Sequence, residues 1–327
     1  MRLLVLGGTR FLSHAIAADA VARGHQVTCA ARGESGAVPV GAQHVVLDRA
    51  APDWHALDGA WDAVLDVART PSWVADALAA LAERVAHWTF VSTISVYAES
   101  ATPGGSQDTS PLLAPITDDV EQDTPEAYGG SKVACEQHVQ TRARQALVVR
   151  PGLIVGPGDP SGRFSYWPER LAEGGAVLAP EPPDRPAQVI DVRDLASWIV
   201  TCSENRVTGV YDATGPVSSL GDMLEEIARS VGGGAELVWV DARFLLEHDV
   251  DYWAGPRSLP LWLPDEDIGV TSRDVTVAFA AGLTTRPISA TARDTLAWLS
   301  SAEEPTRTGL TRAEERDLLD EWDSTRA

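Results

Sequence analysis

Short apolar runs separated by amphipathic stretches recur along the first two thirds of the chain. The runs lie near residues 1–6, 26–30, 44–47, 63–68, 88–93 and 146–150. Apolar runs of this length are typical of strands buried on both faces of a parallel sheet. Between two of them, from Pro71 to Trp88, apolar residues have helical spacing at Val74, Leu78, Leu81 and Val85. The alternation predicts an α/β fold with a doubly wound, Rossmann-type parallel sheet.

The first apolar run leads directly into a glycine turn and a helix start. These residues are Gly7, Gly8, Thr9, Arg10, Phe11 and Leu12. A β-turn-α unit of this kind presents helix N–H groups and the positive end of the helix dipole to an anion, which predicts a dinucleotide site. Arg10 and Ser13 stand where the full fingerprint has glycines, and Arg10 removes a close backbone approach to pyrophosphate. The alternative is a glycine-rich turn of some other α/β protein.

The end of the second strand bears on which nicotinamide dinucleotide would bind. An NAD site normally has an acidic residue here for the adenosine ribose, but this chain reads Ala30-Ala31-Arg32. Arg10 and Arg32 together could hold a 2′-phosphate, since arginine binds phosphate through two parallel hydrogen bonds. We therefore expect NADP(H) to be preferred over NAD(H); two ordinary exposed arginines are the alternative.

A tyrosine and the single lysine of the chain lie four residues apart, at Tyr128 and Lys132. All other cations among the 26 Lys+Arg residues are arginines. Spacing by four places both side chains on one helical face. A nearby ammonium favours the phenolate, so it would lower the pKa of Tyr128 and make it a usable proton donor or acceptor. An ordinary exposed helix lysine is the alternative, so other segments have to support the pair.

Four segments, in order, resemble the extended short-chain dehydrogenase/reductase family of NAD(P)-dependent epimerases, dehydratases and reductases. They are the glycine turn, Thr93–Tyr97, Tyr128–Lys132 and Val149–Pro157. The resemblance runs to about residue 215 and is looser beyond. It implies a dinucleotide-binding domain of residues 1–155, to which 188–215 returns, and a substrate-binding lobe of residues 156–187 and 216–327.

The resemblance also implies roles for individual residues. Tyr128 would be the acid/base, Lys132 would contact the nicotinamide ribose and tune Tyr128, and Thr93 would orient the substrate oxygen. Asp48, after the third strand, would contact adenine, and Ala68 would border the cofactor through its backbone. The remaining expected cofactor contacts, from the segment after the sixth strand, are Pro151 and Leu153.

Departures from the family pattern narrow the reaction. Sugar-nucleotide dehydratases carry Asp-Glu after the threonine, where this chain has Ile94 and Ser95, so 4,6-dehydration is disfavoured. Nucleotide-sugar epimerases place an arginine for the diphosphate where this chain has Ala187; Arg185 lies only two residues away. The set Thr93, Tyr128 and Lys132 remains, and it suffices for hydride transfer to or from a carbonyl.

Aromatic residues in loop-like sequence of the lobe, together with Ser95, are the expected substrate contacts. They are Tyr166, Trp167, Tyr252, Trp253 and Trp262, with Phe164 beside them. An aromatic-walled pocket suits an apolar or ring-containing substrate better than a diphosphate. Plain core packing is the alternative, expected for about half of them.

Three functions follow from these residues. The first is an NADP(H)-dependent oxidoreductase acting on a carbonyl or alcohol of a small, apolar or ring-containing metabolite. The second is an NAD(P)-dependent sugar or sugar-nucleotide epimerase with a retained nucleotide. The third is a non-catalytic dinucleotide- or RNA-binding relative, which the Thr/Tyr/Lys set disfavours.

Charge and cysteine content exclude several partners. The chain has 327 residues and a net charge of −21, which disfavours nucleic acid and anionic membranes. Three cysteines without metal spacing, scattered histidines and the absence of an 18-residue apolar span favour a cytoplasmic protein without metal or membrane anchor. We expect a monomer or homodimer with a small-molecule substrate.

Two further segments carry expectations of their own. The polar connection 99–124 is long enough to overhang the site. Thr311 and Glu314 have the spacing of a capping box and predict an amphipathic terminal helix.

Overall fold

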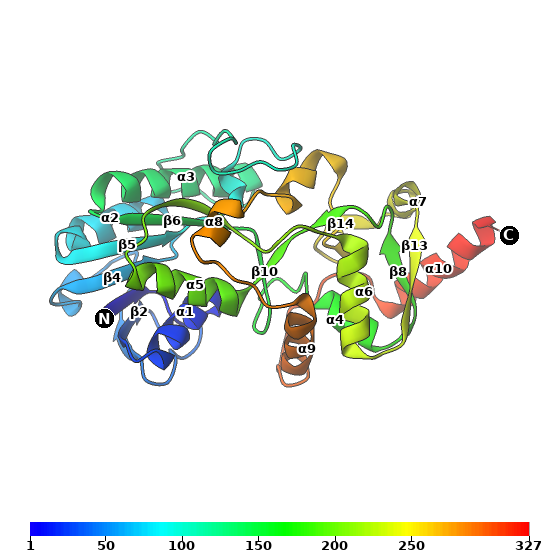
Figure 1. The fold of residues 1–327 in the computed structure, drawn as a ribbon, viewed down its shortest axis with the longest axis horizontal. Coiled ribbons are helices and arrows are strands. Elements are labelled where there is room, and N and C mark those ends of the chain that lie inside the picture. The colour runs from blue at the N-terminus through cyan, green and yellow to red at the C-terminus, as the bar shows by residue number, and fades with distance from the viewer. Residues whose placement is uncertain (327) are drawn as a thin grey trace.

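The computed structural model describes residues 1–326 and contains a seven-stranded central sheet (Figure 1). In spatial order its strands are β11 (Gly209–Ala213), β6 (Ala146–Pro151), β5 (Val85–Val91), β4 (Trp61–Asp66), β1 (Arg2–Leu6), β2 (Gln26–Ala31) and β3 (Gln43–Val46). Every neighbouring pair is parallel. The predicted doubly wound α/β fold is confirmed.

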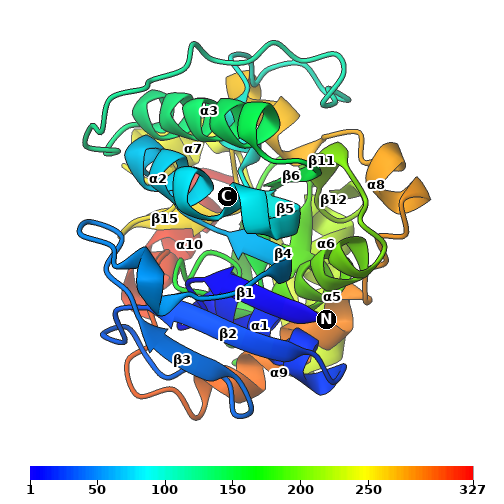
Figure 2. The same cartoon turned by 90° about the vertical axis from the view of Figure 1, so that its left-hand side faces the viewer.

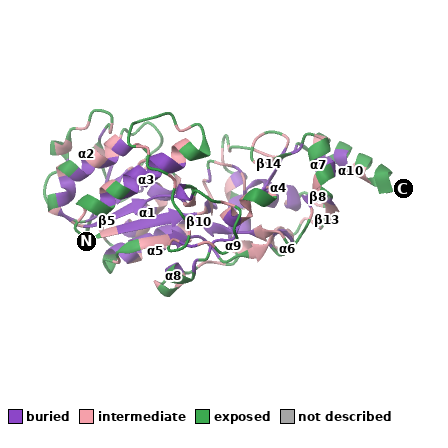
Figure 3. Ribbon diagram, turned by 90° about the horizontal axis from the view of Figure 1, so that it is seen from above, coloured by how far each residue is buried: buried purple, intermediate pink, exposed green. Residues whose placement is uncertain are grey.

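Helices cover both faces of this sheet, which explains why its strands are apolar throughout. Leu3 and Val5 of β1 pack toward α1 (Phe11–Ala22) and α5 (Val192–Glu204). Leu4 and Leu6, which point the other way, pack toward α2 (Pro71–Leu81) and α3 (Pro125–Arg142). The end-on view in Figure 2 shows these two helical layers, and Figure 3 shows the strands buried between exposed helix surfaces.

The helix predicted over 71–88 is wrong at its carboxyl end. The α-helix stops at Leu81, a 3₁₀ turn covers Ala82–Arg84, and Val85 opens β5. Val85 is in register with Trp61 of β4, and Trp88 with Val64. The helical spacing of Val85 was coincidental, because strand pairing on both sides of β5 determines its conformation.

A second hydrophobic core lies in the lobe on the right of Figure 1. Its elements are α4 (Tyr166–Ala172), β8 (Gly175–Pro180), α6 (Leu220–Val231), β13 (Ala235–Val240), α7 (Ala242–Glu247), β14 (Asp251–Trp253), β15 (Ser258–Pro260), α9 (Ile288–Leu299) and α10 (Arg312–Arg326). The helix α8 (Thr276–Ala280) packs instead on the sheet, through Ala278, although the sequence placed it with the lobe. The domain division otherwise stays a prediction.

The remaining elements of the described chain are short. They are β7 (Leu153–Val155), β9 (Pro186–Ala187), β10 (Val189–Asp191), β12 (Ser218–Ser219) and the 3₁₀ turns η1 (Trp54–Ala56), η3 (Ile94–Val96) and η4 (Asp265–Thr271). Within the described residues, no helix is long and apolar enough to cross a bilayer.

The long connection 99–124 is fastened to the segment after η4. Gly104 donates a backbone hydrogen bond to Ser272 (2.7 Å), and Asp274 donates one to Gly105 (2.9 Å). At the carboxyl end, the backbone N–H of Thr311 donates to Glu314 Oε2 (2.9 Å), and that of Glu314 donates to Thr311 Oγ1 (3.3 Å). The predicted capping box therefore opens α10.

Candidate active site

The glycine turn after β1 fits the residues expected around a dinucleotide. Gly8 has φ +101°, and a Cβ there would lie 2.4 Å from the Sγ of Cys29, so only glycine packs against β2 at this point. The hydroxyl of Ser13 accepts from the Gly8 N–H (3.1 Å) and donates to the Arg10 carbonyl (2.8 Å). Arg10 forms no side-chain cap on α1 in the described structure, so the first N–H groups of the helix remain available to an anion.

Lys132 is buried, not an exposed helix lysine. Its side chain projects from α3 onto the sheet, and Nζ donates to the carbonyls of Ala68 (2.9 Å) and Val91 (2.5 Å). The ammonium also lies 4.3 Å from the centroid of the Phe90 ring. An ammonium has three N–H donors, so one remains for a ligand. Burial lowers the pKa of Lys132 to about 8, although Cys135, Asp66 and Glu136 oppose the shift.

The expected lowering of the Tyr128 pKa is wrong in direction. Burial raises the pKa of Tyr128, while the Thr93 hydroxyl and then the Arg69 guanidinium only oppose that rise. Burial of the phenol is the physical reason, and the Lys132 ammonium does not offset it because it is directed to two backbone carbonyls. The helical spacing brought the two residues to one face without specifying where the ammonium points.

One cavity of about 840 Å³ brings together the residues expected to carry the chemistry. It begins at the carboxyl edge of the sheet and extends into the lobe. Of the sequence-predicted residues, those on its wall are Phe11, Thr93, Ser95, Tyr128, Lys132, Pro151, Leu153 and Trp253. Thr93 caps the turn η3 by accepting from the Ser95 N–H (3.1 Å) and donates to the Ser95 hydroxyl (3.1 Å), so it is held in place at the end of β5.

The other expected cofactor contacts lie outside the cavity. Arg32 is 55% exposed at its side chain and pairs with Glu34 (3.4 Å), a carboxylate that the sequence reasoning missed. Asp48 is exposed, and its Oδ1 accepts from the Ala50 N–H (3.0 Å). Arg10 is exposed as well. These residues follow β2, β3 and β1, which are neighbours in the sheet, so they share one edge; their contacts with a nucleotide stay predictions.

Most of the aromatic substrate candidates are core residues. Tyr166, Trp167 and Trp262 are buried in the lobe, and Trp167 Nε1 donates to the Pro260 carbonyl (2.8 Å). Tyr252 packs on Trp262, with ring centroids 4.1 Å apart, and does not reach the cavity wall. The loop-like sequence suggested exposure, but these large rings fill the core of a lobe with few strands. Only Trp253 of this group faces the cavity.

Several polar residues of the cavity wall were missed. They are Ser92, Asp159, Arg163, Gln188 and Arg273. The Ser92 hydroxyl is buried without a hydrogen-bond partner among the described residues. Asp159 and Arg163, four residues apart after β7, were a visible signal in the sequence. Arg273 gave no such signal, because it lies 182 residues after Val91, another residue of this wall, and only tertiary packing brings the two together.

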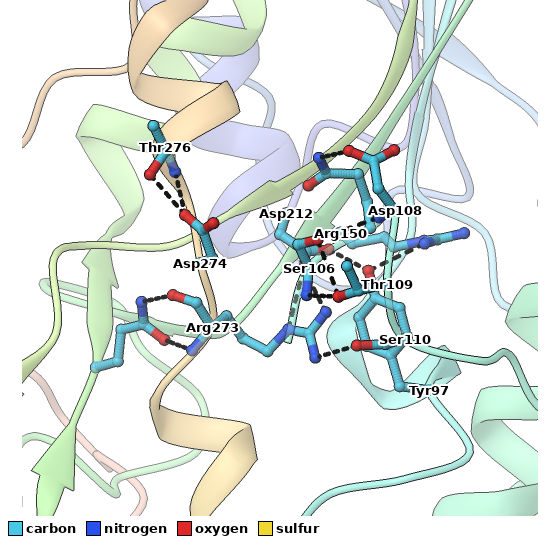
Figure 4. Close-up of polar contacts among 12 residues, drawn as sticks. Tyr97, Ser106, Asp108, Thr109, Ser110, Arg150, Asp212, Arg273, Asp274 and Thr276 are labelled. Carbon is cyan, nitrogen blue, oxygen red and sulfur yellow. Dashed lines mark hydrogen bonds and ion pairs between the residues drawn. The ribbon is translucent and has the colours of Figure 1, made fainter. Parts of the chain in front are cut away.

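Four buried charged residues and one tyrosine form a connected chain at this wall, and Figure 4 shows Tyr97, Arg150, Asp212 and Arg273 of them. Arg150 of β6 donates twice to Glu136 (2.9 and 2.6 Å) and once to the Tyr97 hydroxyl (3.0 Å). Tyr97 donates to Asp212 of β11, which also accepts two bonds from Arg273 (3.0 and 2.7 Å). Burial raises the pKa of Asp212, and Arg273 opposes the shift. We call these five residues the charge chain.

Comparison with known proteins agrees with this fold. The model of the NAD dependent epimerase/dehydratase family matches residues 3–213. An NAD-dependent NDP-hexosamine 5,6-dehydratase involved in tunicamycin biosynthesis superposes with a TM-score of 0.67 at 18% identity, over 92% of this chain and 98% of its own. No curated protein sequence matches the chain significantly.

Two further solved structures contain NAD. The UDP-glucuronic acid 4-epimerase of Bacillus cereus, in complex with NAD, superposes with a TM-score of 0.65 at 15% identity over 92% of this chain and 97% of its own. WbmH of Bordetella bronchiseptica, in complex with NAD⁺, has a TM-score of 0.63 at 16% identity, over 93% and 99%. At these identities the likeness establishes the shared fold.

Proposed function

Because this chain belongs to the NAD dependent epimerase/dehydratase family, we propose that it is an epimerase-type enzyme. It would oxidise and re-reduce one hydroxyl-bearing carbon of a ring-containing substrate while its nicotinamide dinucleotide stays bound. The observation that carries the proposal is the convergence of Thr93, Tyr128 and Lys132 on the wall of one large cavity next to the glycine turn.

We assign a role to each of the residues around the cavity and the glycine turn. The bound dinucleotide supplies a hydride acceptor and donor. The N-terminus of α1 and the turn at Gly8 would hold its pyrophosphate, and the remaining N–H of Lys132 would bond its ribose. Tyr128 would accept the proton of the substrate hydroxyl as the phenolate and return it as the phenol. Thr93 orients the substrate oxygen toward that phenol.

The earlier hypothesis of an NADP(H)-dependent reductase has less support than the epimerase alternative. The family name and the solved relatives point to epimerases and dehydratases, including one described in complex with UDP-glucuronic acid and NAD. One observation still favours the reductase. Arg185, the substitute for the missing diphosphate arginine, donates to the Leu263 carbonyl (2.8 Å) and pairs with Asp265 (2.8 Å), outside the cavity wall.

The cofactor is a nicotinamide dinucleotide, and its 2′ substituent remains a matter of proposal. Arg10 and Arg32 are exposed, so both side chains could bind a 2′-phosphate, which supports NADP(H). The pairing of Arg32 with Glu34 reduces the positive charge there. Relatives described with NAD support the unphosphorylated form. We therefore propose weak discrimination between the two.

The test uses the protein as purified. Acid release of any bound nucleotide, identified by mass spectrometry, shows whether NAD(H) or NADP(H) is retained. UDP-glucose and UDP-glucuronic acid are then incubated with the protein without added nucleotide, and NMR follows inversion at a ring carbon. Conversion without added nucleotide supports the epimerase. NADPH consumption with a simple ketone, and no inversion, would establish the reductase instead.

A further inference from the structure

Arg163 is a cavity-wall arginine that lacks a charged partner. It lies between β7 and α4, and within residues 1–326 it forms no ion pair, while its Nε is buried without a hydrogen bond. Arg273, on the same wall, makes two hydrogen bonds to Asp212 and one to Ser110. Unlike Arg273, Arg163 therefore keeps its donor fork for something outside the protein.

An aromatic ring holds the Arg163 side chain in position. The guanidinium carbon lies 4.9 Å from the centroid of Trp253, the one aromatic substrate candidate on the wall. Trp253 has φ +67°, in the left-handed region that residues with a side chain rarely adopt. Its backbone N–H donates to the Trp262 carbonyl (3.0 Å), so the lobe core determines where the ring stands.

Burial lowers the pKa of Arg163, and the Asp159 carboxylate opposes that shift without forming an ion pair with Arg163 in the described chain. Asp159 is buried, and its two oxygens accept from the Ser161 N–H (2.8 Å) and the Ser161 hydroxyl (3.0 Å). The carboxylate is thus directed into its own turn. Burial raises the pKa of Asp159, while the hydrogen bonds from Ser161 and then the Arg163 guanidinium oppose the rise. An oxyanion at Arg163 would meet a guanidinium in a setting where water competes weakly.

We propose that Arg163 and Trp253 form a subsite for an oxyanion, either carboxylate or phosphate, that the substrate carries next to a planar or apolar face. Arginine binds both oxyanions through two parallel hydrogen bonds, and the indole covers the adjoining face. The inference rests on the proposed function in one respect, that this cavity is where the substrate binds. It adds that the substrate is charged, which the aromatic lobe sequence did not predict.

The experiment compares matched probes that differ by the oxyanion. Uridine is paired with UMP, and glucose with glucuronic acid, and each is titrated by NMR into the nucleotide-loaded protein. We expect the charged member of one pair to bind about 10- to 100-fold more tightly than its neutral member, the usual value of charge-assisted hydrogen bonds. Preference for UMP identifies phosphate as the source, and preference for glucuronic acid identifies carboxylate.

Four variants test whether the preference belongs to the subsite. R163Q should abolish it, R163K should retain part of it because the charge remains without the fork, and R307Q, at the exposed Arg307–Glu169 pair, should leave it unchanged. W253A should weaken uridine and UMP equally. A preference that survives R163Q, or equal binding of both members of both pairs, overturns the proposal. If the preference holds while no UDP-sugar is converted, the proposed function fails and the subsite stands.

Discussion

Two sets of charged side chains border the same cavity and differ in how they are paired. In the charge chain, each ionic group has a partner of opposite charge: Arg150 with Glu136 (2.6 Å) and Arg273 with Asp212 (2.7 Å). At the lobe end, Arg163 has an aromatic neighbour but forms no ion pair in the described chain. Burying part of a charged group without compensation is costly, so the half-buried, unpaired Arg163 supports the proposed ligand subsite.

The difference separates structural from functional charge. The charge chain joins β6, α3, β11 and the segment after η4, and Arg273 also bonds Ser110 of the long connection (3.0 Å) (Figure 4). It therefore holds the cavity wall together. Residues with free capacity toward the cavity, such as Lys132 with one N–H and Arg163 with its fork, are left to bind and react.

Removal of the Tyr128 hydroxyl should produce the largest effect on activity and almost no effect on stability. Tyr128→Phe deletes the proposed acid/base, and losses of roughly 10²–10⁴-fold in kcat are usual for such a group. Nucleotide affinity and the urea midpoint should remain near those of the unmodified protein. Tyr211→Phe, which removes a hydroxyl bonded to the Thr208 carbonyl (3.2 Å), is the matched control and should keep its turnover. Equal turnover of both variants would exclude Tyr128 from the chemistry.

The same substitution, arginine to glutamine, should lower the free energy of unfolding by different amounts in the charge chain and at Arg163. Arg273→Gln leaves the Asp212 carboxylate buried without its cation, and losing one partner of a buried pair costs about 3–5 kcal/mol of unfolding free energy. Arg163→Gln removes no such pair and should cost much less. Urea unfolding of the two variants measures both values. A smaller loss for Arg273→Gln than for Arg163→Gln would invert the assignment of structural and functional charge.

Lys132 is buried like the residues of the charge chain, but like Arg163 it keeps a free N–H donor. The pH dependence of the unfolding free energy should reveal the cost of burying its ammonium. Its pKa is about 8 in the folded protein, against roughly 10.4 in an unfolded chain, so the folded state binds fewer protons between these values. Stability then rises with pH across that window, by up to about 1.4 kcal/mol per pH unit. Urea unfolding from pH 7 to 10 should show this rise in the unmodified protein and not in Lys132→Met. Parallel pH profiles would mean that the ammonium is not destabilised by burial.

The smallest effect concerns the exposed pair at the far edge of the sheet. Glu34→Gln frees Arg32 for a 2′-phosphate, and an exposed pair is worth about 0.2–1 kcal/mol, so the ratio of NADPH to NADH affinity should rise by roughly 1.4- to 5-fold. Nucleotide titrations monitored by tryptophan fluorescence measure it. Glu83→Gln, at the exposed Glu83–Arg144 pair, is the control and should leave the ratio unchanged. A fall in the ratio would exclude Arg32 from phosphate binding.

Local signals were sufficient for the sheet and for the residues nearest the glycine turn. Apolar runs marked the strands because burial on both faces leaves no room for polar residues, and Gly8 marked the turn because a Cβ would strike Cys29. The helix end at Leu81 was missed, because strand pairing of Val85 overrides helical spacing. Of the aromatic candidates, most proved to be core, since a pattern of rings does not distinguish a pocket wall from a packed interior.

The sequence by itself determined the fold class and the placement of Tyr128 and Lys132 on one helical face, because these depend on spacing along a single element. Only the tertiary structure decided where the Lys132 ammonium points, and that Arg163 lacks the partner which Arg273 has. Asp212 and Arg273 lie 61 residues apart and meet only in the folded chain. Pairing of charges depends on which distant segments the core brings into contact, and no local pattern records that.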